Sequence, residues 1–426
     1  MADDTYEHLL RCKAVELHRK GLGVRTILAR TGRSRGWLAK WLQRFRAEGW
    51  VGLRARSRAP HRWPRAVSAR MVARVLTVHA ELGSPRRRAG RFAGRGAEAV
   101  RLELESRRVR PLPALRTVER LLQRHGATRR DPPPRSGGGE PYPAPRAHRP
   151  GDLHETDLVG PRHLRGPRGV TRFYTVHTVA VVGRGAATRQ GRHKTAAFLC
   201  DHFVRAWREL GVPRVSQIDN EMAATGGGRH PGALSVVIRL HLLVGAHLVF
   251  IPPGEPGRNA HVESFNALWQ ARVLRHPCPD LRALRRTAGA FLRYYHLRKP
   301  HRALRAAADG TRLPGPWLVR HRRHLRPLPS RFALAGYRDA RGHVRLPLAR
   351  GRVSFIRKVD AHGRIEIPGL AYFVGKRLTG RYVTATLFTH RAEVVVKQGG
   401  RIHKRFPFPI GEPMVAPWLP LAPGRI

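Results

Sequence analysis

The sequence predicts a multidomain protein with an all-α N-terminal region, an α/β domain and a small antiparallel β-barrel near the C-terminus. Three observations lead to this prediction. Apolar residues recur at helical spacing up to about residue 126. Strand and helix patterns alternate from residue 151 to 320, which is typical of an α/β domain. Beyond residue 325, period-two alternation is broken by glycine turns without helices, which is typical of a barrel.

The composition favours nucleic acid as a partner. The 426 residues include 82 Lys and Arg against 28 Asp and Glu, which gives a formal net charge of +54. A positive field of this size attracts polyanions and excludes an ordinary acidic metabolic enzyme. Hydrophobic residues make up 41% of the chain, which is enough to build apolar cores. The length indicates roughly two to four domains.

Cysteine usage and the N-terminus point to a cytoplasmic protein. Cys12, Cys200 and Cys278 are widely spaced and form neither a disulfide framework nor a zinc site. The first residues, MADDTYEHLL, lack the basic and apolar regions of a signal peptide. No apolar run is long enough to span a bilayer, so we expect no membrane partner. A DNA-binding protein of this kind would be associated with the nucleoid.

Residues 1–60 are predicted to form a helix-turn-helix DNA-binding domain. A first helix ends at Gly21, a short second helix ends at Gly32, and Ser34 can cap a third. The third helix is expected to enter the major groove. The alternative is a plain three-helix bundle with a solvated basic face. The expected DNA contacts are Arg33, Arg35, Lys40 and Arg44 on this helix, and Arg54, Arg56 and Arg58 on the basic arm after it.

Further boundaries follow from composition. Residues 66–128 contain three more helical patterns, at 68–82, 97–106 and 115–126. They favour a second helix-turn-helix or winged helical domain, with a dimerising helical spacer as the alternative. Residues 129–150 are rich in Pro and Gly and indicate a linker. The α/β domain is expected at 151–320, the barrel at 325–410, and an unstructured Pro-rich tail at 411–426.

Within the α/β domain, local patterns predict each element in turn. Helix follows strand often enough to predict βα units. The expected strands are residues 153–159, 173–182, 215–218 and 247–251. The expected helices are residues 195–210, an extra helix at 233–244, one containing NAHVESFNALWQARV, and a longer one that reaches Tyr295.

Three carboxylates stand at the ends of these elements. Asp157 lies in the first strand, Asp219 ends the strand at 215–218, and Glu263 begins the helix after the last strand. Residues at neighbouring strand ends converge at one edge of an α/β sheet. Clustered carboxylates repel one another unless a cation lies among them, and oxygen-only ligation favours Mg²⁺ or Mn²⁺. Two such ions would support in-line phosphoryl displacement.

Other interpretations of these acids remain open. Taken singly, Asp219 could cap a turn and Asp157 could pair with an arginine. Glu221 and Glu255 are alternative third ligands. The helix pattern favours Glu263, because its polar and apolar residues separate onto two faces. The polar face carries Asn259, Glu263, Asn266 and Gln270, and the apolar face carries Val262, Phe265, Trp269 and Val273.

Four stretches of the core resemble a known family: HETDLVGP, QIDN, PPGEPGRNAHVESFN and YYHLRKPHRAL. They resemble the DDE transposases of bacterial insertion sequences, which belong to the retroviral-integrase superfamily. The N-terminal RTGRSRGWLAKWLQRFRAEGWVGLRARSRAPH is similar to the helix-turn-helix and basic arm of these transposases. The resemblance runs from about residue 6 to 320. The C-terminal barrel is similar to those that follow the integrase core in related transposases.

The resemblance implies a ribonuclease-H-like integrase core in which Asp157, Asp219 and Glu263 are the catalytic residues and bind two Mg²⁺ or Mn²⁺ ions. It implies cleavage of double-stranded DNA at element ends, transfer of the freed 3′-hydroxyl to target DNA, and a homo-oligomer assembled on DNA. We expect Arg258, Arg298, Lys299 and His301 to contact DNA. The alternatives are a non-catalytic or domesticated relative that acts as a repressor, and a structure-selective nuclease on the same core.

Overall fold

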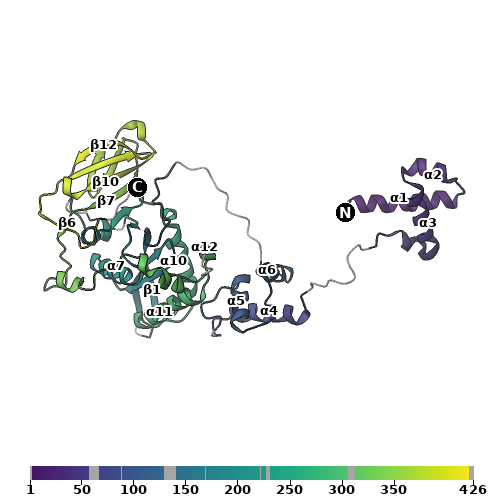
Figure 1. Ribbon diagram of the computed structural model, residues 1–426, viewed down its shortest axis with the longest axis horizontal. Helices are drawn as coiled ribbons and strands as arrows, with labels where there is room; N and C mark the ends of the chain where they lie inside the picture. The colour runs from purple at the N-terminus through teal and green to yellow at the C-terminus, as the bar shows by residue number, and fades with distance from the viewer. Residues whose placement is uncertain are drawn as a thin grey trace. The chain divides into compact units, whose positions relative to one another are not determined.

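The computed structural model divides into two compact units, Met1–Ala69 and Arg70–Ile426 (Figure 1). The finer division into domains at the boundaries given above stays a prediction. None of the described helices is long and apolar enough to cross a membrane. Arg58 and Glu221 lie outside the described residues. The structure describes residues 2–56, 67–87, 89–128, 141–167, 169–220, 222–226, 231–305 and 312–421.

The first unit has the three predicted helices. They are α1 (Ala2–Arg19), α2 (Val24–Thr31) and α3 (Arg35–Glu48), followed by the 3₁₀ helix η1 (Gly49–Leu53). Gly32 ends α2 with φ +63°, a left-handed conformation that a side chain would oppose. Ser34 then caps α3, because its hydroxyl accepts a hydrogen bond from the Trp37 N–H at 3.3 Å. Ile27 and Leu38 are buried between the helices, so the predicted helix-turn-helix is confirmed.

Three helices open the second unit and are attached to its core. They are α4 (Ala69–Gly83), α5 (Ala97–Ser106) and α6 (Leu115–Arg124). The segment between α4 and α5 makes the attachment. Phe92 packs edge-to-face on Phe291 with ring centroids 5.7 Å apart, and Arg275 donates to the Gly90 carbonyl at 2.5 Å. The segment between α4 and α5 therefore packs directly on the core.

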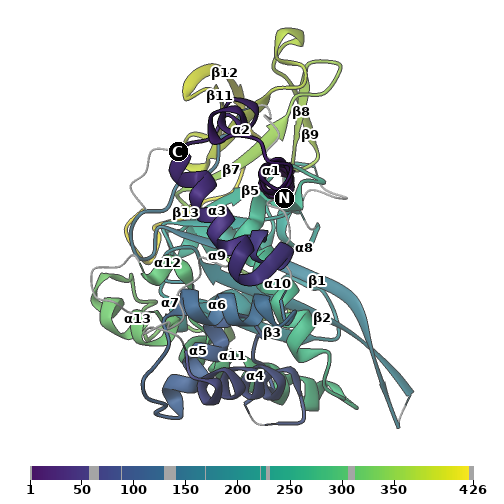
Figure 2. The same cartoon turned by 90° about the vertical axis from the view of Figure 1, so that its right-hand side faces the viewer.

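Nine described strands form one sheet in the order β12-β11-β10-β7-β5-β4-β1-β2-β3. Strands β1, β2 and β3 pair antiparallel, whereas β1, β4 and β5 pair parallel. This gives the mixed sheet of an α/β domain. Figure 2 shows the long β1–β2 hairpin projecting from the sheet. The core strands are β1 (Leu153–Gly166), β2 (Gly169–Ala180), β3 (Ala186–Gly191), β4 (Val215–Ile218) and β5 (His247–Phe250).

The separate C-terminal barrel is not confirmed, because these strands extend the core sheet. β7 pairs parallel with β5, and Val249 lies opposite Ser354. β10, β11 and β12 then add in antiparallel order. The strands are β6 (Leu348–Ala349), β7 (Arg352–Lys358), β8 (Arg364–Ile367), β9 (Leu370–Phe373), β10 (Tyr382–Phe388), β11 (Glu393–Gln398), β12 (Arg401–Pro407) and β13 (Met414–Val415).

Helices cover the two faces of the sheet unequally. α10 and α11 pack over β1, β2 and β3 on one face, while α7 and α9 lie on the other. We call the first of these the α10 face. The helices of the core are α7 (Ala196–Leu210), α8 (Met222–Thr225), α9 (Val236–Leu243), α10 (Ala260–Val273), α11 (Leu281–Arg298), α12 (Arg302–Arg305) and α13 (Pro314–His321).

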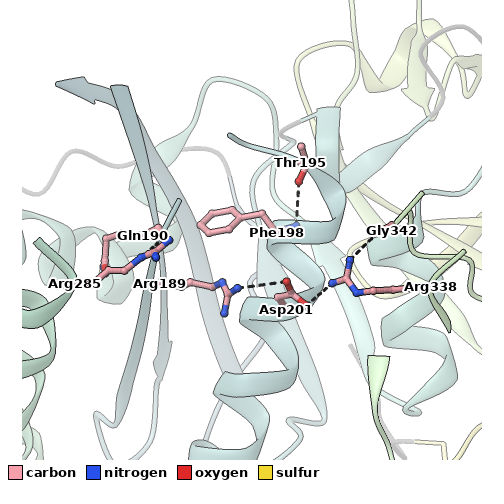
Figure 3. Close-up of polar contacts among 8 residues, drawn as sticks. All are labelled: Arg189, Gln190, Thr195, Phe198, Asp201, Arg285, Arg338 and Gly342. Carbon is pink, nitrogen blue, oxygen red and sulfur yellow. Dashed lines mark hydrogen bonds and ion pairs between the residues drawn. The ribbon is translucent and has the colours of Figure 1, made fainter. Parts of the chain in front are cut away.

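Polar contacts hold the outer strand β3 in place (Figure 3). Asp201 of α7 accepts from Arg189 of β3 at 3.4 Å and from Arg338 at 2.7 Å. On the other side, Arg285 of α11 donates to the Gln190 carbonyl at 2.9 Å. Such contacts protect a strand at the end of a sheet from pairing with another chain.

Two segments expected to lack structure are packed instead. Tyr142, in the predicted linker, meets Tyr382 edge-to-face with centroids 5.4 Å apart. In the predicted tail, Trp418 meets Phe332 edge-to-face at 5.7 Å, and its N–H donates to the Leu243 carbonyl. Their Pro-rich composition did not predict this packing, because it depends on a few aromatic residues that contact surfaces made by distant parts of the chain.

Candidate active site

The register between β1 and β4 brings two of the predicted acids together. Glu155 lies opposite Gln217, and Thr156 lies opposite Ile218. The next residue along each strand is Asp157 on β1 and Asp219 after β4. Side chains alternate between faces, so positions 155 and 157, and likewise 217 and 219, share the α10 face. The two aspartates therefore occupy neighbouring positions on one face of the sheet.

The residues two positions earlier hold the start of α10. The Glu155 carboxylate accepts from the backbone N–H groups of His261 at 2.8 Å and Val262 at 3.1 Å. The Gln217 amide donates to the Arg258 carbonyl at 2.9 Å, just before the helix. We call Glu155 and Gln217 the helix clamp. It fixes the first turn of α10. Within the clamp, Glu155 satisfies helix N–H groups that would otherwise lack partners.

Glu263 lies in that first turn and is electrostatically coupled to Asp157. Burial, followed by the charge of Asp157, raises the pKa of Glu263. Burial also raises the pKa of Asp157, against hydrogen bonds from Asn266 and the Leu158 backbone. The Asn266 amide donates to Asp157 Oδ2 at 2.5 Å. One turn of α10 thus lies against the Asp157 carboxylate.

The loop after Asp219 is fixed by a C-terminal strand. Arg357 of β7 donates to Asn220 Oδ1 at 2.8 Å and to the Ile251 carbonyl at 3.3 Å. Asn220 in turn donates to the same carbonyl. Arg357 is buried, and this burial lowers its pKa to about 10. The C-terminal strands therefore take part in building the site.

The chemistry of the donor set fits a divalent cation. Asp157, Asp219 and Glu263 offer only oxygen, which Mg²⁺ and Mn²⁺ prefer. The raised pKa values show that the folded chain disfavours the charged form of two of these acids, and a bound cation would reverse that. Asn266 Oδ1 is buried without a hydrogen-bond partner among the described residues. Within the same residues, no three His, Cys, Asp or Glu side chains already form a metal-holding group.

A cavity of about 860 Å³ opens beside the helix clamp. Glu155, Gln217 and His261 line it, and His261 Nδ1 lies 2.7 Å from Glu155 Oε1. Burial raises the pKa of Glu155 to about 7. Asp157 and Glu263 do not line this cavity, so it belongs to the clamp rather than to the carboxylates.

Glu255 and Arg258 are engaged with the C-terminal strands. Glu255 accepts from the Tyr382 hydroxyl at 2.6 Å and from Arg258 at 2.9 Å, and the Arg258 guanidinium lies 4.1 Å from the Tyr142 ring centroid. Burial would raise the pKa of Glu255, but the hydrogen bonds from Tyr382 and Arg258 lower it. Glu255 thus makes contacts expected of a structural residue. The assignment of Arg258 to DNA stays a prediction.

The other predicted DNA contacts are placed as follows. Arg298 is exposed at the end of α11, whereas Lys299 and His301 are half-buried. Burial, followed by the charge of Arg184, lowers the pKa of Lys299 to about 8. Burial and the charge of Lys299 lower the pKa of His301 to about 3. These values favour an uncharged His301, which weakens its attraction to phosphate.

In the N-terminal unit, the predicted contacts fall into two groups. Arg35 and Lys40 are exposed on α3. Three others make side-chain contacts within the unit: Arg33 pairs with Glu7, Arg56 pairs with Glu48, and Arg44 donates to the backbone carbonyl of Arg54 at 3.1 Å.

The sequence did not single out the helix clamp or Arg357. A signal for the clamp was present, because Glu155 and Gln217 lie two positions before Asp157 and Asp219 on period-two strands. Both share a face with the acid that follows them. Arg357 carried no such signal, since its role depends on the pairing of β7 with β5.

Two family models match parts of this chain, and several solved structures are similar to it. Residues 11–73 match the family model of a winged helix-turn-helix, and residues 244–308, which include Glu263, match that of an integrase core domain. The HTLV-2 integrase catalytic core domain in complex with magnesium is 13% identical, with 36% of this chain and 92% of that chain covered and a TM-score of 0.28. A simian T-cell lymphotropic virus intasome in complex with the PP2A regulatory subunit B56 gamma is 14% identical, with 76% and 96% covered and a TM-score of 0.33. Residues 11–73 and 244–308 thus match a helix-turn-helix and an integrase core, a combination consistent with an insertion-sequence transposase of the integrase superfamily.

Proposed function

We propose that this chain is a transposase that binds double-stranded DNA at element ends and catalyses metal-dependent strand cleavage and strand transfer. The observation that carries the proposal is the β1–β4 register, which makes Asp157 and Asp219 neighbours on the face where α10 supplies Glu263. The integrase core domain supports the same reaction class.

In this proposal, Asp157, Asp219 and Glu263 hold two Mg²⁺ or Mn²⁺ ions. Bound ions would lower the pKa of an attacking water or 3′-hydroxyl and stabilise the leaving oxygen. The HTLV-2 core, whose structure contains magnesium, supports the choice of metal. Asn266 orients Asp157 through its amide, and the helix clamp fixes the helix that bears Glu263. The chain's own residues thus position the metal ligands.

The DNA partner enters through the helix-turn-helix unit. Exposed Arg35 and Lys40 on α3 supply positive charge for the element ends, and target DNA is the second substrate. We infer a homo-oligomer on DNA, because cleavage and joining of paired ends requires two active sites. The intasome among the structural neighbours agrees with this inference. A DNA-bound protein of this kind would lie at the nucleoid.

The test compares three isosteric variants, Asp157→Asn, Asp219→Asn and Glu263→Gln. The substrate is DNA that carries the inverted repeats flanking the coding region, with Mg²⁺ or Mn²⁺. Each variant is expected to lower strand cleavage by about 10³-fold, because each removes a ligand charge worth several kcal/mol in the transition state. Binding to the same DNA is expected to stay within about twofold, since charge loss near DNA does not remove phosphate contacts.

Glu209→Gln is the matched control, because it makes the same change at an ion pair on α7 away from the site. It should cleave like the wild type. Cleavage by any of the three site variants at the wild-type rate would overturn the assignment of that residue. A wild-type chain that binds the repeats and cleaves nothing with either metal would instead be the non-catalytic, repressor-like relative.

A further inference from the structure

The α10 face of the sheet has a second half that none of the described helices covers. It is made by β4, β5, β7, β10 and β11, and the segment 141–148 runs along it. Between this segment and the sheet lies a groove of about 1100 Å³. The groove shares its face with Asp157 and Asp219, because Val215 on its floor is two and four positions before Gln217 and Asp219.

Positive charge dominates the walls of this groove. Only one acid, Asp152, is among its described lining residues. The cations come from segments far apart in the sequence, so the fold gathers them at one place. They are Arg146, Arg214, Arg352, Arg381, Lys397 and Arg401.

The single acid offsets little of this charge. Asp152 accepts from Arg214 at 3.1 Å, and its other oxygen accepts from the backbone N–H groups of His148 and Arg149 at 2.9 and 2.8 Å. It is therefore used to fix the segment that forms the groove wall. Burial and the charge of Arg214 lower the pKa of Arg352, so these cations lie close enough to repel. An anion between them would relieve that repulsion.

The floor and the far wall suit an extended chain. Tyr382, Thr384, Thr386 and Phe388 alternate along β10 and line the floor. Gly399 and Gly400 form the turn at the far wall, with φ of +54° and +82°, and a side chain at either position would be strained. Aromatic faces beside spaced cations are characteristic of sites for nucleic-acid strands.

We propose that this groove binds the phosphodiester backbone of a nucleic-acid strand, at a site separate from the helix-turn-helix unit. The proposal deepens the DNA-binding function proposed above and rests on it for the source of the strand. A backbone places one negative charge at every step, which matches cations spread over several strands and the 141–148 segment. A small anion would need only one or two of them.

The test reverses three cations of the groove in the full-length chain, as Arg381→Glu, Lys397→Glu and Arg401→Glu together. Binding is measured by fluorescence anisotropy with a labelled single strand and with a labelled duplex, neither of which carries the terminal repeats, over a range of salt. Affinity is expected to fall about tenfold or more. The salt slope for the single strand should fall by about 2, since each lost phosphate contact contributes about 0.7.

The matched control carries Arg282→Glu, Arg286→Glu and Arg293→Glu, three exposed positions of α11 outside the groove with the same change in net charge. It should lose no more than about twofold. Loss on the single strand alone assigns the groove to a separated strand, and loss on the duplex as well assigns it to duplex backbone. Equal losses of affinity in the groove and control variants would overturn the proposal. A labelled poly-glutamate peptide serves as a non-nucleic polyanion, and a loss of affinity for this peptide alone would also overturn the proposal.

A second readout locates the contact. A single strand containing 5-iodouridine is photocross-linked to the full-length chain, and the modified peptides are mapped. Adducts are expected in residues 141–148 or 382–401. Adducts confined to residues 2–56 would contradict the groove. This outcome is independent of catalysis. A wild type that is inactive but carries adducts in the groove would overturn the proposed transposase function and support the groove proposal. An active wild type without such adducts would overturn the groove proposal and support the transposase function.

Discussion

One face of one sheet is built in two different ways. Over β1, β2 and β3 it is covered by α10 and α11, and its side chains join an apolar cluster that includes Phe173, Phe265 and Trp269. Over β10 and β11 the same face carries Thr384 and Lys397 and borders a cationic groove. The candidate carboxylates lie near the boundary, on β1 and at the end of β4.

This difference separates stability from binding on a single surface. The covered half gains free energy from apolar burial, which requires helices above it. The open half keeps its cations accessible and derives little stability from them. In the two proposals above, the first half holds the candidate carboxylates at the boundary rigidly while nucleic acid lies along the second half.

The largest effect should come from removing a large side chain in the covered half. Trp269 on α10 is 1% exposed and contacts His177, with ring centroids 5.0 Å apart. Trp269→Ala is expected to lower the free energy of unfolding by about 3–5 kcal/mol, because it leaves a cavity that the helix cannot fill. Arg401→Ala, in the open half, should change it by less than about 0.5 kcal/mol. Chemical denaturation measures both free energies of unfolding, and similar losses in the two variants would contradict this difference between the two halves.

The next effect concerns pH and the helix clamp. The pKa of Glu155 is raised from 4.5 to about 7 by burial, so the folded chain holds this proton more tightly than the unfolded chain does. Its contribution to stability is full below pH 4.5 and is lost as pH rises to 7. Glu155→Gln cannot titrate. Relative to this variant, the wild type should lose up to about 3 kcal/mol of unfolding free energy across that window.

The measurement is denaturation of both proteins at several pH values, so that contributions from groups that do not interact with Glu155 cancel in the difference. Parallel curves for wild type and Glu155→Gln would show that the clamp carboxyl titrates alike in both states. A wild type that gains stability across the window would mean that the hydrogen bonds from the α10 backbone outweigh burial.

A smaller effect is expected from the other member of the clamp. Gln217→Ala removes the hydrogen bonds to the Arg258 carbonyl and Asn259 Oδ1, and should cost about 1–2 kcal/mol. If the clamp positions Glu263, strand cleavage should fall and the Mg²⁺ concentration for half-maximal cleavage should rise, with DNA affinity unchanged. Arg208→Ala, which removes a hydrogen bond to the Phe332 carbonyl on the opposite side, is the control. Equal cleavage by both variants would leave the clamp a purely structural role.

Local sequence patterns were sufficient for most elements of the core. Thr195 was expected to open a helix, and its hydroxyl accepts from the Phe198 N–H at 3.1 Å at the start of α7 (Figure 3). The strand predicted at 215–218 is β4, and the extra helix predicted at 233–244 is α9 (Val236–Leu243). Caps and periodicity act within a few residues, so one sequence reveals them.

Pairing between distant segments was not accessible in the same way. β3 was missed because AATRQG has neither strong alternation nor β-branched enrichment, and it is held by contacts from α7 and α11. The C-terminal strands were predicted as strands, but their period-two pattern suits a barrel and a sheet extension equally. Their partner is set by β5, whose edge would otherwise be unpaired.

The candidate site was likewise predictable from the sequence only in part. Asp157, Asp219 and Glu263 could be proposed from scarcity, order and resemblance, and the register of β1 and β4 supports the first two as neighbours. Their roles stay predictions. The helix clamp needed three-dimensional contacts, because a Glu and a Gln on strands are common surface residues. Their meaning depends on the helix packed above them.

The hydrogen bonds from Arg357 to Asn220 and Ile251 have a consequence for how the protein is made. Synthesis runs from the N-terminus, so all three acids leave the ribosome long before β7 does. Until β7 arrives, β5 has a bare edge and the loop beside Asp219 lacks its brace. A nascent or prematurely terminated chain would therefore carry the helix-turn-helix unit without a finished candidate active site. If the proposed function is correct, only a completely translated chain would be able to cleave DNA.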